Sequence, residues 1–257
     1  MSTARFRELL PQIASGKVSA LAEAISIVED EHWSREFLNS EFELRDYPHV
    51  LGITGSPGVG KSTTTTVLID EYLAQGKKIV ILAVDPSSPI TGGALLGDRI
   101  RLSKHYSDPH VYIRSLATRG TLGGLSSAIP GLFPLLGAAG FDLIIVETVG
   151  VGQNEIEIMK YADTILIVLS PAIGDDVQAA KAGIMEIGDI YFVNKADLDG
   201  ADRTVMEVEK SLALTPRRNS WQPRVLKGQM GSKTPQGSHE LYEAIELHVK
   251  EMGLTPR

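Results

Sequence analysis

The run Gly55–Ser62, which reads GSPGVGKS, fits the pattern G-x-x-x-x-G-K-[ST] and constrains the fold more than any other feature of the chain. It directly follows an apolar run predicted to be a strand, and it opens a helical pattern over Ser62–Gln75. Glycines let such a loop turn so that successive backbone N–H groups point at phosphate oxygens, and the start of the helix adds positive potential. Lys61 can then bridge the β- and γ-phosphates, and the Ser62 hydroxyl can reach Mg²⁺. In this setting the pattern predicts a nucleotide-phosphate site rather than a glycine-rich turn that matches by chance.

Short apolar runs alternate with segments of helical length from His49 onwards. Some runs, such as Leu143–Val146, are apolar on both faces, as expected of strands that helices cover on either side of a parallel sheet. This order, with the phosphate loop, predicts an α/β fold of the P-loop NTPase type over residues 49–257: a mostly parallel sheet flanked by helices, with a last helix at Glu240–Glu251. The predicted strands are Val50–Thr54, Lys78–Val84, Val111–Ser115, Asp142–Glu147, Thr164–Leu169, Ile190–Val193 and Arg224–Lys227.

The first 48 residues differ in composition from the rest. They contain nine Asp/Glu and five Lys/Arg, so they carry −4 of the formal net charge of −7. Apolar residues recur near the helical period, with a break at Ser15-Gly16 and a third helix over about 33–44 that ends before Tyr47-Pro48. Residues 1–48 are therefore predicted to be an N-terminal helical extension packed onto the main domain. The residues that set the period are Phe6, Leu9, Leu10, Ile13, Leu21, Ile25 and Val28.

Composition excludes several classes of protein. The 257 residues include no cysteine, which rules out disulfides, thiolate zinc sites, iron–sulfur clusters and cysteine nucleophiles. The six histidines are scattered without a metal-binding spacing, so no transition-metal site is expected. A pI of about 5.4 disfavours binding to nucleic acid, and no apolar run is long enough to span a bilayer. We therefore expect a cytoplasmic protein that binds neither nucleic acid nor membrane.

A second motif, Asn194-Lys195-Ala196-Asp197, lies at the end of the predicted strand Ile190–Val193. The Asp197 carboxylate can accept hydrogen bonds from both N1–H and the N2 amine of guanine, whereas adenine has no such pair of donors. Asn194 can hold the loop or the purine, and the aliphatic stem of Lys195 can cover the base. The same tetrapeptide could be a helix-capping turn, but downstream of a phosphate loop it favours guanine.

Carboxylates and the hydroxyl of the phosphate loop are the ligands that Mg²⁺ prefers. Asp85 and Glu147 lie at the ends of two predicted strands, where ligands of such sheets gather, and Asp98 lies in the glycine-rich connection TGGALLGDRIR. Each could instead be a helix cap or a solvated loop carboxylate. The predicted metal ligands are Ser62, Asp85, Asp98 and Glu147.

Other polar residues are weaker candidates. Arg99, Arg101 or Arg119 could stabilise charge during phosphoryl transfer, but a loop arginine is more often part of a surface ion pair. Gln153 could orient a water molecule or simply begin a helix. The predicted catalytic residues are Lys61, Glu147 and Gln153.

Several longer stretches together resemble one family. They are GSPGVGKST, AVDPSSPITGGALLGDRIRL, TRGTLGGLS, FDLIIVETVGVGQNE, GDDVQAAKAGIMEIGDI and VNKAD, within residues 49–200. They are similar to the MeaB/ArgK family of P-loop GTPases, which act as chaperones for cobalamin-dependent acyl-CoA mutases such as methylmalonyl-CoA mutase. The resemblance implies a SIMIBI-like P-loop NTPase fold and slow GTP hydrolysis with Mg²⁺. It also implies that the GTP state gates cobalamin loading and protection of the mutase, and that the mutase raises the hydrolysis rate.

The resemblance also assigns roles along this chain. It implies nucleotide-sensitive switches at Asp85–Arg101, at Glu147–Glu155 and around Gly174-Asp175-Asp176. One departure is the sequence Gly228-Gln229-Met230, which stands where the family usually has a T-S-A-like base loop, so that only backbone N–H groups there are expected to meet guanine. Members also tend to be longer, with a C-terminal arm that builds a homodimer, so a homodimer is a weaker expectation here. The residues implied to bind GTP or GDP are Gly55, Ser56, Pro57, Gly58, Val59, Gly60, Lys61, Ser62, Thr63, Asn194, Lys195, Asp197, Gly228, Gln229 and Met230.

Two alternative functions are compatible with a phosphate loop. A nickel-insertion GTPase for a hydrogenase or urease would be expected to carry His- or Cys-rich motifs, which this sequence lacks. A kinase of a transport protein would need an acceptor base and a substrate groove. Stoichiometric nickel binding would favour the first, and transfer of phosphate to a protein would favour the second.

Overall fold

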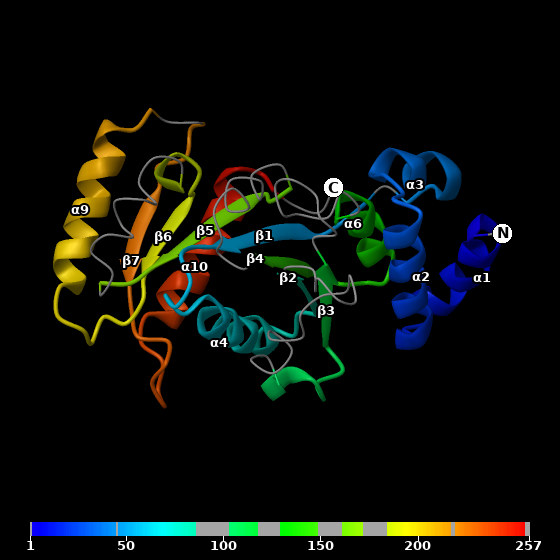
Figure 1. Cartoon of the computed structure of the whole chain (residues 1–257), viewed down its shortest axis with the longest axis horizontal. Helices are drawn as coiled ribbons and strands as arrows, with labels where there is room; N and C mark the ends of the chain where they lie inside the picture. The colour runs from blue at the N-terminus through cyan, green and yellow to red at the C-terminus, as the bar shows by residue number, and fades with distance from the viewer. Residues whose placement is uncertain are drawn as a thin grey trace.

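The computed structural model describes residues 2–44, 46–85, 103–117, 129–148, 161–171, 184–216 and 219–254. Within these ranges, seven parallel strands form one sheet in the order β3-β2-β4-β1-β5-β6-β7 (Figure 1). Because all pairs are parallel, the carboxyl ends of the strands lie at one edge of the sheet and the amino ends at the other. The strands are β1 (His49–Thr54), β2 (Ile79–Asp85), β3 (Val111–Ala117), β4 (Leu143–Thr148), β5 (Thr164–Leu169), β6 (Ile190–Val193) and β7 (Arg224–Lys227).

Helices cover both faces of the sheet, and alternating strand residues enter the two apolar layers between them. In β4, Ile144 and Val146 join the layer under α1, α2, α3, α6 and α9, whereas Leu143 and Ile145 join the layer under α4 and α10. The central strands are therefore apolar on both faces, as the sequence predicts. The helices are α1 (Ser2–Ala14), α2 (Val18–Asp30), α3 (Arg35–Phe42), α4 (Lys61–Ala74), α6 (Ile129–Ala138), α9 (Ala201–Leu214) and α10 (Ser238–Glu251), with short 3₁₀ turns η1 (Ser103–His105) and η3 (Ile184–Glu186).

The three N-terminal helices lie at one end of the molecule beside α6 (Figure 1). The ring of Phe6 packs against Trp33 and Phe42, with centroids 5.1 and 4.6 Å away. Arg114 of β3 donates to the buried carboxylate of Glu29 in α2 at 2.6 Å. The apolar residues that set the helical period of this region are mostly buried, and their core continues without a break into the sheet.

The predicted fold class is confirmed: the chain forms a parallel sheet flanked by helices, with the phosphate loop between β1 and α4. Strands β5, β6 and β7 have the predicted bounds, and other ends differ by one or two residues. For example, α4 begins at Lys61 rather than Ser62, and β3 continues to Ala117 rather than Ser115. In the described ranges no helix combines the length and apolarity needed to cross a membrane.

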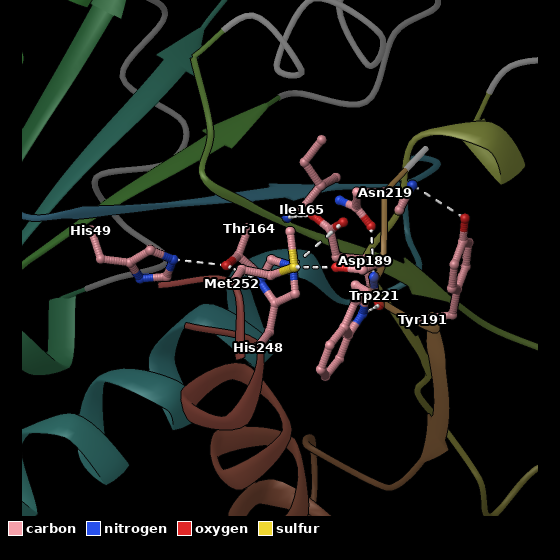
Figure 2. Close-up of polar contacts among 11 residues, drawn as sticks. His49, Thr164, Ile165, Asp189, Tyr191, Asn219, Trp221, His248 and Met252 are labelled. Atoms are coloured by element: carbon pink, nitrogen blue, oxygen red, sulfur yellow. Dashed lines mark hydrogen bonds and ion pairs between the residues drawn. The ribbon is translucent and has the colours of Figure 1, made fainter. Parts of the chain in front are cut away.

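A buried polar network occupies the amino edge of the sheet (Figure 2). The Thr164 hydroxyl at the start of β5 lies 2.8 Å from Nε2 of His49 and 2.7 Å from Nδ1 of His248, so it can donate to one ring and accept from the other. Nε2 of His248 lies 3.6 Å from the Asp189 carboxylate. The indole N–H of Trp221 donates to the Asp189 carbonyl at 2.8 Å. The network joins β1, β5, α10 and the segments that precede β6 and β7.

Candidate functional site

The loop after β1 is shaped by glycines that no other residue could replace without a shift. Gly55 has a φ of +140°, and a Cβ atom there would lie 2.1 Å from the carbonyl oxygen of Val168 in β5. Gly60 has a φ of +99°, and its Cβ would lie 2.3 Å from the side-chain nitrogen of Asn194. Pro57 and Gly58 form the exposed tip between them. The loop is therefore held closely between β5 and the Asn194 motif, with the N-terminus of α4 opening onto it.

The ammonium group of Lys61 folds back over this loop. Its Nζ donates to the carbonyl oxygens of Gly55 at 2.5 Å and Ser56 at 3.0 Å, and the side chain is buried. This contact holds a positive charge inside the curve of the loop, where P-loop proteins bind the phosphates of a nucleotide.

Ser62 and Glu147 lie together beside the loop. The Ser62 hydroxyl donates to Oε1 of Glu147 at 2.6 Å, and the Thr65 hydroxyl donates to Oε2 at 2.8 Å. Glu147 is the penultimate residue of β4, the strand next to β1, which is why its buried side chain reaches the start of α4. A hydroxyl and a carboxylate are hard oxygen donors, so this pair fits the chemistry of a Mg²⁺ ligand set.

Asn194, directly after β6, joins two loops of the site. Its Nδ2 donates to the carbonyl of Val59 at 2.9 Å, and its Oδ1 accepts from the N–H of Met230 at 3.0 Å. Nζ of Lys195 donates to the carbonyl of Gly58 at 2.7 Å. Asp197 follows in an exposed turn. The Asn194 motif thus lies against the phosphate loop, as a base-binding motif must if one nucleotide is to contact both.

The backbone of Gly228-Gln229-Met230 is already engaged within the protein. The three N–H groups donate to the Val193 carbonyl, to the Gln236 carbonyl and to the Asn194 side chain, each at 3.0 Å. Met230 is also buried in the core. A guanine carbonyl would therefore compete with protein acceptors for these groups. A cavity of ≈ 530 Å³ lies between the residues that follow in this loop and the start of α4, where Ser62 and Thr63 line it.

Several predicted residues lie outside the described part of the chain. These comprise Asp98 and Gln153, the three loop arginines, the Gly174-Asp175-Asp176 loop and most of the other two switch segments. For Asp85 the structure describes the backbone at the end of β2 but not the side chain. Among the described residues, no three His, Asp or Glu side chains cluster in a way that could hold a metal ion.

The sequence reasoning missed two hydroxyl contacts at this edge. One is the Thr65 contact with Glu147, and the other is the bond from Thr148 to Thr54, 3.0 Å long, between the ends of β4 and β1. The sequence signal for the Thr65 contact is the run of four threonines at Thr63–Thr66. Threonine is a poor helix former, so four of them in one helix indicate that at least one hydroxyl has a specific partner.

A phosphate loop, a guanine-type motif placed against it and a parallel sheet around both define the class of P-loop GTPases. A profile of the family described as methylmalonyl Co-A mutase-associated GTPase MeaB matches residues 21–257, and the chain belongs to that family. As the sequence predicts, it binds guanine nucleotide and is a GTPase.

Individual relatives agree with this assignment. A Pyrococcus horikoshii protein provisionally named a GTPase is 47% identical over 247 residues, which cover 95% of this chain and 77% of the relative. GTPase ArgK of Escherichia coli is 35% identical over 254 residues, or 95% and 76% of the two chains. A Caenorhabditis elegans protein named methylmalonic aciduria type A homolog, mitochondrial, is 36% identical over 247 residues, or 88% and 62%.

Solved structures show the same fold. The crystal structure of a LAO/AO transport system kinase aligns with a TM-score of 0.75 and 28% identity, covering 97% of this chain and 78% of that one. HypB from Helicobacter pylori in complex with nickel aligns with a TM-score of 0.59 and 21% identity, covering 90% and 97%. The second likeness concerns the fold alone.

Proposed function

We propose that this GTPase requires Mg²⁺ and serves as a chaperone that gates cobalamin loading and protection of an acyl-CoA mutase. The observation that carries the proposal is the family match over residues 21–257, because the family's description names association with methylmalonyl-CoA mutase. The C. elegans relative, named for methylmalonic aciduria, supports the same assignment. In this proposal residues 1–48 are a helical extension of the GTPase domain at 49–257.

The residues of the site take the following roles in the proposal. Lys61 would exchange its bonds to the loop carbonyls for bonds to phosphate oxygens, where its charge offsets that of the γ-phosphate during transfer. Ser62 and Glu147, together with Asp85 and Asp98, would hold Mg²⁺. When bound, this ion would neutralise charge on the phosphates. Gln153 would orient the attacking water.

The base site in the proposal consists of Asn194, Lys195 and Asp197, with the loop Gly228–Met230 beside them. The Asn194 contacts with Val59 and Met230 keep the two loops together, so that the exposed Asp197 carboxylate can reach the purine edge. Guanine offers two adjacent donors to that carboxylate. Replacing one carboxylate oxygen by the NH₂ group of an amide should therefore weaken guanine binding sharply.

The Asp197→Asn variant tests the base site. We expect its affinity for GTP to fall by at least about 100-fold, since a charge-assisted pair of hydrogen bonds is lost and an amide N–H faces the guanine amine. Affinity for XTP should rise, because xanthine carries a carbonyl at that position. Asp199→Asn, an exposed residue of the same turn, is the matched control and should bind GTP like the unmodified protein. Equal GTP affinity of the two variants would contradict the assigned base site.

A purified apo-mutase tests the chaperone role. Apo methylmalonyl-CoA mutase from the same organism should co-elute with this protein in the presence of a non-hydrolysable GTP analogue, and it should raise the GTP turnover severalfold. Transfer of cobalamin to the mutase should then depend on GTP hydrolysis. If the mutase neither co-elutes nor changes turnover at tens of micromolar, the chaperone role is wrong even though the protein hydrolyses GTP.

The kinase alternative has one specific observation in its favour: the solved structure that aligns with a TM-score of 0.75 is named a transport system kinase. Incubation with GTP labelled at the γ-phosphate separates the two functions. A chaperone GTPase releases the label as inorganic phosphate, whereas a kinase leaves it on a protein. The nickel-insertion alternative rests on a fold likeness, and equilibrium dialysis with Ni²⁺ would reveal the stoichiometric binding that it requires.

A further inference from the structure

We infer that Thr65 is a positioning residue whose hydroxyl fixes the orientation of the Glu147 carboxylate for Mg²⁺ binding. The inference rests on the proposed role of Glu147 as a metal ligand. Thr65 lies outside every motif that the sequence analysis singled out, and it would touch neither nucleotide nor metal.

The geometry of the carboxylate supports this role. Oε1 of Glu147 accepts from Ser62 at 2.6 Å and Oε2 accepts from Thr65 at 2.8 Å, so each oxygen has its own hydroxyl donor. The two donors are three residues apart on α4 and therefore project from the same face of the helix. Thr65 is fully buried and Glu147 is 3% exposed, so water does not compete freely for these contacts.

The single proton of the Thr65 hydroxyl has two possible acceptors. The Lys61 carbonyl lies 3.1 Å away and the Glu147 carboxylate lies 2.8 Å away. The carboxylate is the nearer acceptor and carries negative charge, so it receives the stronger hydrogen bond. The neighbouring threonines differ in this respect. The hydroxyls of Thr64 and Thr66 donate to the carbonyls of Gly60 and Ser62, four residues earlier in the helix, at 3.0 and 2.8 Å.

The Thr65 contact would matter most with Mg²⁺ bound, because the Ser62 hydroxyl would then turn towards the metal ion and stop donating to Glu147. The bond from Thr65 would still hold Oε2 of Glu147, which would keep Oε1 directed at the start of α4. Hydrogen-bond partners of metal ligands typically change metal affinity by about 10- to 100-fold when they are removed.

The test compares nucleotide affinity with and without the metal in the full chain. The dissociation constant of a fluorescent GDP analogue is measured in EDTA and in saturating Mg²⁺, and the ratio of the two values reports metal binding without any turnover. For Thr65→Val we expect this ratio to fall by about tenfold, with the value in EDTA unchanged. Thr65→Ser, which keeps the hydroxyl, should restore the ratio. Thr64→Val is the matched control, because Thr64 is equally buried and its hydroxyl donates within the described residues to the Gly60 carbonyl and not to Glu147, so its ratio should not change.

As an independent test, the affinity of the GDP-bound protein for Mn²⁺ can be measured by electron paramagnetic resonance. It should rank the variants in the same order as the ratio does. An unchanged ratio in Thr65→Val would overturn the inference, as would an equal fall in Thr64→Val. Thr65→Ala provides a second reading if the valine variant does not fold. Glu147→Gln separates this inference from the proposal on which it rests. If Glu147→Gln keeps the Mg²⁺ response of the unmodified protein, Glu147 is not a metal ligand and the proposed metal set is wrong.

Discussion

The two edges of the sheet carry similar polar side chains, but at the carboxyl edge these face a ligand site and at the amino edge they contact one another. At the carboxyl edge, Lys61 donates to carbonyls of a glycine-rich loop, and Ser62 donates to Glu147. A phosphate or a metal ion can take over these contacts. At the amino edge, Thr164 bridges two imidazole rings and Asp189 lies within a buried set of donors and acceptors (Figure 2).

The difference lies in the backbone around the side chains. Glycines with positive φ and the N-terminus of α4 leave N–H groups of the carboxyl edge open to a ligand. At the amino edge, the strand starts and α10 bury Thr164, Asp189 and His248, which contact one another. We therefore expect substitutions at the carboxyl edge to change turnover and those at the amino edge to change stability.

The largest effect is expected for Lys61→Ala. Loss of the positive charge beside the γ-phosphate should lower kcat for GTP by about 10²–10³-fold, since a preorganised charge in such a site typically contributes that much. The circular dichroism spectrum should be unchanged. Lys77→Ala, an exposed residue beyond the end of α4, is the control. Turnover within twofold of the unmodified protein would place the phosphate chemistry elsewhere.

At the amino edge, Thr164→Val should lower the free energy of unfolding by about 2–3 kcal/mol, because it leaves two buried imidazole nitrogens without their shared hydroxyl. In a chain of this size the melting temperature should fall by roughly 5–10 °C. GTP turnover measured well below that temperature should be unchanged. A variant that melts normally but hydrolyses GTP slowly would show that the network acts on the nucleotide site and would remove the contrast between the edges.

The two edges also differ in how far the sequence predicts them. The phosphate loop and the Asn194 motif are local patterns, and the strand–loop–helix order around the first places it at the carboxyl edge. The network has no such pattern, because Thr164 lies 115 residues from His49 and 84 from His248. Only the strand order, in which β1 and β6 flank β5, brings these groups together. Thr65 was missed for a similar reason, since its partner Glu147 comes from a strand 82 residues away.

The smallest effect concerns pH. Burial, with a further contribution from the charge of His248, lowers the pKa of His49 to about 3 from an ordinary value near 6.5. Between pH 6.5 and about 3 the unfolded chain therefore binds a proton at His49 that the folded chain does not. It follows that the free energy of unfolding falls by about 1.4 kcal/mol for each pH unit from this group.

In urea unfolding at pH 7, 6 and 5, His49→Gln should lack this contribution, so that its stability deficit relative to the unmodified protein narrows as the pH falls. His110→Gln, at an exposed position, should keep the full slope. A slope in His49→Gln equal to that of the unmodified protein would mean that the imidazole at position 49 is not held neutral. The amino edge would then bind protons in the folded state. The two edges would differ only in that the carboxyl edge accepts phosphate.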